Sequence, residues 1–341
     1  MLQHEAAAAL WYAVLATAWI AYLAQESFIV GSGMLHRFGY GPAKRRSIQL
    51  SAGLHYDGIE VWLIVAVGGT FAAFPPVFAA ILSSLYVPFF LLIASLIVRA
   101  ISIEFMYKDD SPGWRELMSF LWALSSLLVP FVLGVYFANL FRGIAVDSSG
   151  YRGMILELFG YAGLAGGIFF VAEALVAGAA WIRLTTIEDR EGKEPERAAP
   201  VAAILALFAL LVLFLALNNR TELFTGSALY AKAPILWALP VAAVISAALA
   251  ALAAWRRTAA PQFVAAAATS VLAMASLFAA AFPRMLMSST DPLFGLDAFT
   301  ASSSQRTLGV MTWVAAVFIP IVLAYQAWKY ARFRKDKHGE A

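Results

Sequence analysis

The sequence predicts an all-α protein, a polytopic integral membrane helical bundle of about nine transmembrane helices. Of its 341 residues, 62% are hydrophobic and only 13% are charged, and the mean hydropathy is +0.77. Soluble domains average about 45–50% apolar and about 25% charged residues. The composition therefore places the chain in a membrane. Because cysteine is absent, disulfides, thiolate metal sites and iron–sulfur clusters are excluded.

Nine apolar stretches are long enough to cross a bilayer, which takes about 20 residues in a helix. The first stretch follows no basic segment, so we expect a membrane span there and no cleavable signal peptide. The predicted spans are 8–30, 57–75, 77–100, 116–141, 154–182, 200–218, 234–255, 261–283 and 307–328.

Basic residues are distributed unequally between the two sides of these spans. The loops after odd-numbered spans and the C-terminal tail hold 17 lysines and arginines, whereas the opposite loops hold six. Because basic loops stay in the cytoplasm, we expect the N-terminus outside and the C-terminus in the cytoplasm. The sequence pI of about 9.1 then reflects topology, and we expect no nucleic-acid partner.

A charged segment divides the spans into two groups. Residues 188–199 (EDREGKEPERAA) form a predicted cytoplasmic linker. The front half, residues 1–187, holds five spans and the ionisable residues that could form a polar pathway. The back half, residues 200–341, holds four spans and a basic tail.

Four ionisable residues enter the front half from its cytoplasmic side: Glu26, His55, Asp57 and Glu60. Glu26 is predicted to lie about 6 Å inside the first span, and Glu60 about 7.5 Å along the second, so their depths are similar. Asp57 and Glu60, three residues apart, share a helix face. Charges at this depth are usually paired, hydrated or functional. We therefore favour a proton relay, whereas the alternative is that these side chains only cap helices and snorkel to the interface.

Three further features are less specific. Glu173 lies near the middle of the fifth span, where it could join a second relay or pair with a partner subunit. Arg99 and Glu104, five residues apart, are expected to form a structural ion pair. No glycine loop for phosphate, nucleophile elbow or zinc motif is present. With four histidines and no intramembrane pair of them, we expect no metal site and no haem with two histidine ligands in this chain.

Three stretches of the sequence resemble subunit II of the cytochrome bd-type quinol oxidase. The first, at 26–35, is ESFIVGSGML, and the second, at 57–75, is DGIEVWLIVAVGGTFAAFP, followed by a run that ends at Arg99. The third, at 283–330, contains SSTDPLF and ASSSQRTLGVMTWVAAVFIPIVLAYQAWKY. The chain departs from the family pattern at Ser27, Ile29 and Tyr56, where glycine, aspartate and tryptophan are usual.

The resemblance implies a subunit of a respiratory complex in the prokaryotic cytoplasmic membrane that oxidises quinol and reduces oxygen to water. It implies a partner, subunit I, that carries two haems b, one haem d and the quinol site, and it allows a small single-helix accessory subunit. Membrane lipid and quinone complete the expected surroundings. This chain alone is then not catalytic.

The resemblance also assigns roles by position. Glu26 and Asp57 fall on the family's proton-path carboxylates, with His55 beside Asp57, and Trp62 falls near a proposed oxygen route. Glu60 is expected to compensate for the acid missing at Ile29. The rival functions are a stand-alone proton-coupled secondary transporter and a purely structural assembly subunit, although the chain shows no inverted repeat typical of transporters.

Overall fold

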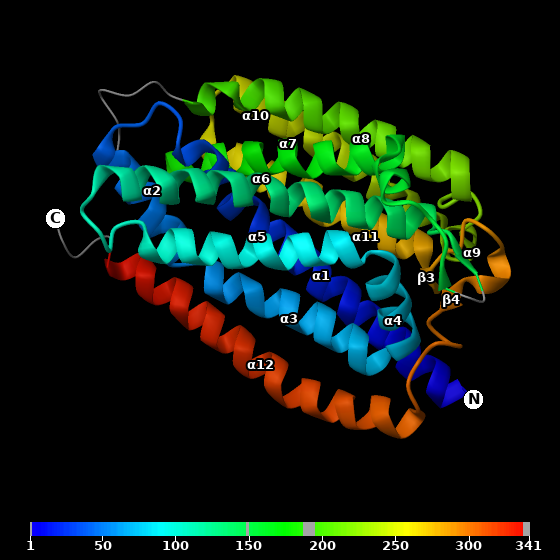
Figure 1. Ribbon diagram of the computed structural model, residues 1–341. Helices are drawn as coiled ribbons and strands as arrows, with labels where there is room; N and C mark the ends of the chain where they lie inside the picture. Colours follow the sequence, from blue (N-terminus) through cyan, green and yellow to red (C-terminus); the bar gives the residue numbers. More distant parts are fainter. Residues whose placement is uncertain (1, 148–149, 187–194, 337–341) are drawn as a thin grey trace.

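The computed structural model of the protein describes residues 2–147, 150–186 and 195–336 (Figure 1). Within these residues, nine helices are long and apolar enough to cross a membrane, which confirms the predicted all-α membrane bundle. The long helices are α1 (Leu2–His36), α3 (Tyr56–Ala73), α5 (Tyr86–Phe105), α6 (Pro112–Arg142), α7 (Tyr161–Thr185), α8 (Ala199–Thr221), α10 (Ala238–Trp255), α11 (Ala259–Ala281) and α12 (Gln305–Asp336).

Shorter elements connect the long helices. The antiparallel strand pairs β1–β2 and β3–β4 lie at the end of the bundle where α6 ends. The short helices are α2 (Pro42–Gly53), α4 (Pro75–Ser84) and α9 (Ala228–Lys232), with 3-10 turns at Ile155–Phe159, Pro195–Ala198, Pro234–Trp237 and Pro292–Phe294. The strands are β1 (Val146–Asp147), β2 (Gly150–Tyr151), β3 (Arg284–Leu286) and β4 (Leu296–Asp297).

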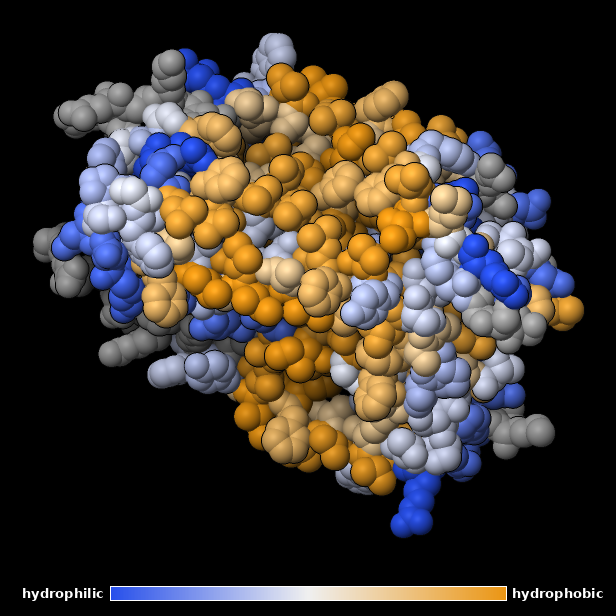
Figure 2. Space-filling view, viewed as in Figure 1, coloured by the Kyte–Doolittle hydropathy of each residue, from blue (hydrophilic) through white to orange (hydrophobic). Residues whose placement is uncertain are grey.

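The surface has the distribution of polarity that a bilayer requires. Figure 2 shows apolar residues across the middle of the visible face and polar residues gathered towards both ends. Large apolar side chains such as Phe90, Val201 and Phe208 are exposed on the helices. A soluble protein rarely exposes so much contiguous apolar surface. The exposed middle of the bundle is therefore suited to lipid or to a partner chain.

Glycines allow the closest helix contacts in the core. A methyl group added to Gly178 of α7 would overlap the backbone of Gly31 in α1, and Gly134 and Gly166 meet in the same way between α6 and α7. Small residues at such crossings permit backbones to approach, as is usual in membrane bundles. Helix α7 thus packs tightly against both α1 and α6 and forms the centre of the fold.

Three predicted boundaries are wrong. The predicted span 154–182 begins too early, because α7 starts only at Tyr161, after the 3-10 turn Ile155–Phe159. The segment 31–54, predicted as a loop between the spans 8–30 and 57–75, is mostly helical, because α1 continues to His36 and α2 follows a short turn. The predicted span 77–100 is divided into the short helix α4 and the longer α5, which meet at Leu85. The φ and ψ of Leu85, −112° and 30°, are not helical, so the apolar run bends there although its composition is uniform.

The predicted division into halves and the orientation of the termini stay predictions. Residues 188–194 of the charged linker lie outside the described residues. Helices from both sides of the linker pack together: the Gln262 side chain in α11 donates a hydrogen bond to the Val176 carbonyl in α7 at 2.7 Å.

Helix α12 is attached to the bundle near its N-terminal end. The Trp11 indole of α1 donates to the Leu308 carbonyl at 3.3 Å and to the Thr312 hydroxyl at 3.0 Å. Farther along, α12 lies to one side of the other helices (Figure 1). Its side chains Trp313, Val317 and Phe318 are exposed. Much of this last span therefore has no cover from the described residues.

Candidate functional site

A buried arginine joins three helices near one end of the bundle. Arg99, in α5, is fully buried, and its guanidinium pairs with the Glu26 carboxylate of α1 and with the Glu60 carboxylate of α3. The distance from Arg99 Nη2 to Glu60 Oε1 is 2.8 Å. The Glu26 side chain is 3% exposed and that of Glu60 is 30% exposed. The prediction that Glu26 and Glu60 lie at similar depth is consistent with this shared contact. We call these three residues the charged centre.

The predicted ion pair between Arg99 and Glu104 is wrong, because Arg99 pairs with Glu26 and Glu60 instead. Glu104 instead accepts a hydrogen bond from the Tyr56 hydroxyl at 3.0 Å. Residues five apart on a helix are separated by about 140° around its axis, because each residue turns about 100°. Arg99 therefore faces α1 and α3, while Glu104 lies on another face of α5.

Tyr22 is a member of this region that the sequence analysis did not single out. It lies one turn before Glu26 in α1, is fully buried and interacts electrostatically with Arg99 and Glu60. Its hydroxyl has no hydrogen-bond partner among the described residues. The spacing of four residues from Glu26 was the signal that could have identified it, because such residues share a helix face.

Asp57 and His55 lie beside the charged centre but have different surroundings. Asp57 is exposed in the first turn of α3, one turn from Glu60. His55 is close to the Ser51 carbonyl, with Nδ1 to O of 2.8 Å, and its ring contacts Phe28 and Trp181. Acidic side chains therefore follow a gradient from exposed Asp57, through partly exposed Glu60, to buried Glu26.

Glu173 and Trp62 are separate from the charged centre. Glu173 of α7 is buried, and its Oε1 has no hydrogen-bond partner among the described residues. Since it is 3% exposed, it does not present a surface for pairing with a partner subunit. Trp62 is partly buried in α3, and its indole nitrogen has no hydrogen-bond partner within the described residues.

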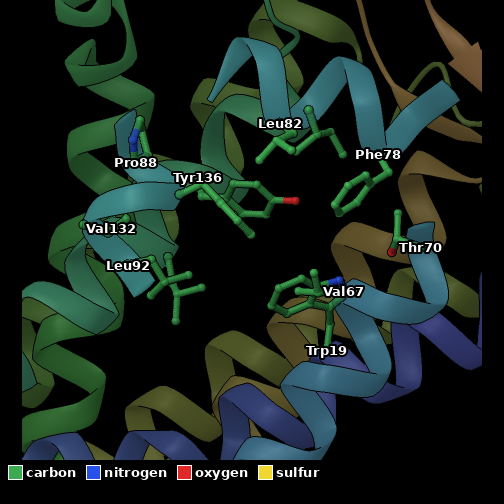
Figure 3. A pocket seen from close by; sticks show the side chains of 12 residues that line it. Trp19, Val67, Thr70, Phe78, Leu82, Pro88, Leu92, Val132 and Tyr136 are labelled. Carbon is green, nitrogen blue, oxygen red and sulfur yellow. The ribbon is translucent and has the colours of Figure 1, made fainter. Parts of the chain in front are cut away.

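A small apolar cavity adjoins the middle of α1 at Trp19 (Figure 3). Its volume is about 40 Å³, and residues of α1, α3, α4, α5 and α6 line it. Trp19, whose ring contacts Tyr22, forms part of the wall. Figure 3 shows Tyr136 and Phe78 pointing towards each other across the cavity. The cavity is thus separated from the charged centre by the side chains of Trp19 and Tyr22.

The histidines of the described residues lie apart from one another, in different surroundings. The described residues contain no group of three or more histidine and acidic side chains that could hold a metal ion. His4 contacts the Ser302 hydroxyl at 3.0 Å, His36 is buried against Ser119 and Trp122, and His55 is engaged as described above. The His4 Nδ1 and His36 Nε2 atoms have no hydrogen-bond partner among the described residues, and His338 lies outside those ranges.

The fold and the charged centre together define a polytopic membrane subunit with ionisable groups buried among its helices. The sequence profile of the cytochrome bd terminal oxidase subunit II family matches residues 7–333. The chain belongs to that family.

Relatives and a solved structure agree with this assignment. The chain is 32% identical to the cytochrome bd-I ubiquinol oxidase subunit 2 of Escherichia coli K12, with 97% of this chain and 95% of that protein covered. It is 31% identical to the cytochrome bd ubiquinol oxidase subunit 2 of Bacillus subtilis, with 96% and 95% covered. The bd oxidase structure from Geobacillus thermodenitrificans matches the fold with a TM-score of 0.74 and 15% identity, over 96% of this chain and 98% of that chain.

Proposed function

We propose that the chain acts as subunit II of a bd-type quinol oxidase in the bacterial cytoplasmic membrane. The complex oxidises quinol and reduces oxygen to water. The two haems b, the haem d and the quinol site belong to subunit I, which this chain stabilises. Membership of the oxidase subunit II family supports this function over a stand-alone transporter.

Within that complex, we propose that the charged centre conducts protons from the cytoplasmic side. The observation that carries the proposal is a single guanidinium between two carboxylates, reached through acidic groups of increasing burial. Arg99 balances one carboxylate charge, and a proton on either carboxyl group neutralises the second. Glu26 and Glu60 can therefore hold one proton between them beside Arg99, which keeps its own proton, and Asp57 is the acidic group exposed at the surface.

The test is the pair of variants Glu26→Gln and Asp57→Asn in a complex purified through a tag on this chain. Glutamine retains the shape of Glu26 and can still accept a hydrogen bond from Arg99, but it cannot carry the proton. We expect quinol oxidase turnover to fall at least about tenfold for Glu26→Gln, as for loss of other proton-transfer groups. A smaller decrease is expected for Asp57→Asn. The haem b and haem d bands should keep their wild-type intensity.

Glu116→Gln is the matched control. Glu116 pairs with Arg37 at 2.8 Å near the same end of the bundle but is 52% exposed and outside the charged centre, so turnover should be unchanged. Wild-type turnover in both Glu26→Gln and Asp57→Asn would contradict proton conduction and favour a purely structural subunit.

A second candidate role, passage of oxygen, is favoured by the apolar cavity of Figure 3. Oxygen is apolar and enters such spaces without the desolvation penalty that polar solutes meet. We expect Val67→Phe, which fills the cavity, to raise the apparent KM for oxygen severalfold while the KM for quinol stays constant. Ile64→Phe, on the exposed face of the same helix, is the control. An unchanged KM for oxygen in Val67→Phe would exclude this cavity from the route.

A further inference from the structure

A second pocket lies at the opposite end of the bundle from the charged centre. Its volume is about 440 Å³, and it is enclosed by the ends of α6 and α8 and by β3 and β4. Helix α5 ends soon after Arg99, and α6 then runs back to Arg142 at this pocket. Loops at this end hold few basic residues, yet Arg142 and Arg284 both line the same pocket. We call it the arginine pocket.

Backbone hydrogen bonds hold the wall of the arginine pocket in place. The Ile144 amide donates to the Met287 carbonyl, and the Ser289 amide donates to the Ile144 carbonyl, both at 2.9 Å. Gly143, with φ of +95°, makes the turn that brings the end of α6 to this segment, a conformation that favours glycine. The Ser288 hydroxyl is also engaged, since it donates to the Val146 carbonyl at 2.8 Å.

The two guanidinium groups are not balanced by acids in the described residues. Arg284 is partly buried, and this burial lowers the pKa of its guanidinium. The nearby Tyr12 hydroxyl acts in the opposite direction and raises that pKa. Arg142 makes a 3.5 Å contact with the Glu157 carbonyl and lies 5.9 Å from the centre of the Tyr161 ring. Neither arginine forms an ion pair with a described carboxylate. Both groups remain protonated, because arginine does not lose its proton in proteins.

One acidic residue, Asp297, also lines the pocket. It is opposite Arg284 in the β3–β4 pairing. Its Oδ1 accepts the Phe299 amide at 2.7 Å and the Thr300 amide at 2.9 Å, so this carboxylate is already engaged in a turn. The pocket therefore presents two guanidinium groups against one committed carboxylate, and its net charge favours an anion.

We propose that the arginine pocket binds a phosphate-type oxyanion through Arg142 and Arg284. The planar guanidinium offers paired N–H donors that match the oxygens of a phosphate group. Two such groups on a fixed wall, in a pocket of this volume, suit a phosphate monoester, a phosphodiester or inorganic phosphate. Because the pocket lies at one end of an apolar bundle, its ligand can come from the headgroup of an anionic phospholipid or from the solution.

The test is thermal unfolding of the intact two-subunit complex, titrated separately with two sources of phosphate. One series uses sodium phosphate against sodium chloride of equal ionic strength. The other adds short-chain phosphatidylglycerol against phosphatidylcholine. We expect a saturable rise in Tm with at least one phosphate source, and the source that produces it identifies the ligand.

The arginine variants test the site itself. Arg284→Gln and Arg142→Gln should each weaken the apparent Kd by about tenfold or more, as expected for loss of a charge-assisted contact. Arg284→Lys retains the positive charge but lacks the paired N–H donors of the guanidinium, so its Kd should be intermediate. This variant also provides a test of the site if the Arg284→Gln complex does not assemble. Arg152→Gln is the control, because Arg152 is already paired with Asp147 at 2.9 Å at the same end.

Two outcomes would overturn the proposal. One is a wild-type Kd in both glutamine variants. The other is the lack of a saturable response to either phosphate source in the wild-type complex. If, in that second case, Arg284→Gln also released subunit I, the pocket would be assigned to an acidic side chain of the partner.

Discussion

Replacing Arg99 with methionine is expected to destabilise the subunit by about 3–5 kcal/mol, the cost of leaving a buried charge without its partner. Glu26 would remain 3% exposed beside an apolar side chain, with Glu60 next to it. The free energy of unfolding of most proteins is only about 5–15 kcal/mol. The Arg99→Met complex should therefore be recovered in low yield and with a lowered Tm.

The control for this prediction is Arg37→Met. Arg37 pairs with Glu116 at 2.8 Å, but their side chains are 32% and 52% exposed. An exposed pair contributes at most about 1 kcal/mol, so Tm should change little. The double variant Arg99→Met/Glu26→Gln should recover part of the lost stability, since it removes one of the unpaired charges. Equal Tm values for Arg99→Met and Arg37→Met would contradict the stabilising role of the charged centre.

The second large effect is expected for Gly178→Ala. The new methyl group would overlap the Gly31 backbone, so α1 and α7 would have to separate. Overpacking of this kind costs about 1–3 kcal/mol, and it should exceed the gain of about 1 kcal/mol from replacing glycine in a helix. We expect a lower Tm of the complex, measured by loss of the haem spectrum on heating.

Gly68→Ala gives the matched comparison within α3. A methyl group at Gly68 meets no atom within 4 Å, so only the gain in helix propensity remains. Its Tm should equal or slightly exceed that of the wild type. If Gly178→Ala and Gly68→Ala shifted Tm equally, the close contact of α1 and α7 would not limit stability.

The spans could be predicted from the sequence because lipid imposes a minimum length of apolar helix. The segment around α2 could not, because its polar residues resemble those of a loop. Its helix is set by tertiary contacts: the Gln49 side chain donates to the Ile103 carbonyl at 2.7 Å, and Ile48 is buried. The break at Leu85 was missed for a related reason, since hydropathy does not report backbone direction.

The depth of Glu26 and Glu60 followed from helical rise, which converts sequence separation into distance. Their shared partner, Arg99, could not be predicted in this way. Which faces of α1, α3 and α5 meet depends on the rotation of each helix, and that is decided by packing along its whole length. The arginine pocket is even harder to predict from the sequence, because Arg142 and Arg284 come from segments far apart in the chain.

The attachment of α12 through Trp11 also bears on the order of assembly. Partners separated by 297 and 301 residues can meet only after the spans between them have been synthesised. The Trp11 indole of α1 therefore has no α12 acceptor while the spans between α1 and α12 enter the membrane. Until α12 docks, Trp11 lacks these two acceptors, so the contact forms only after the intervening spans have been made.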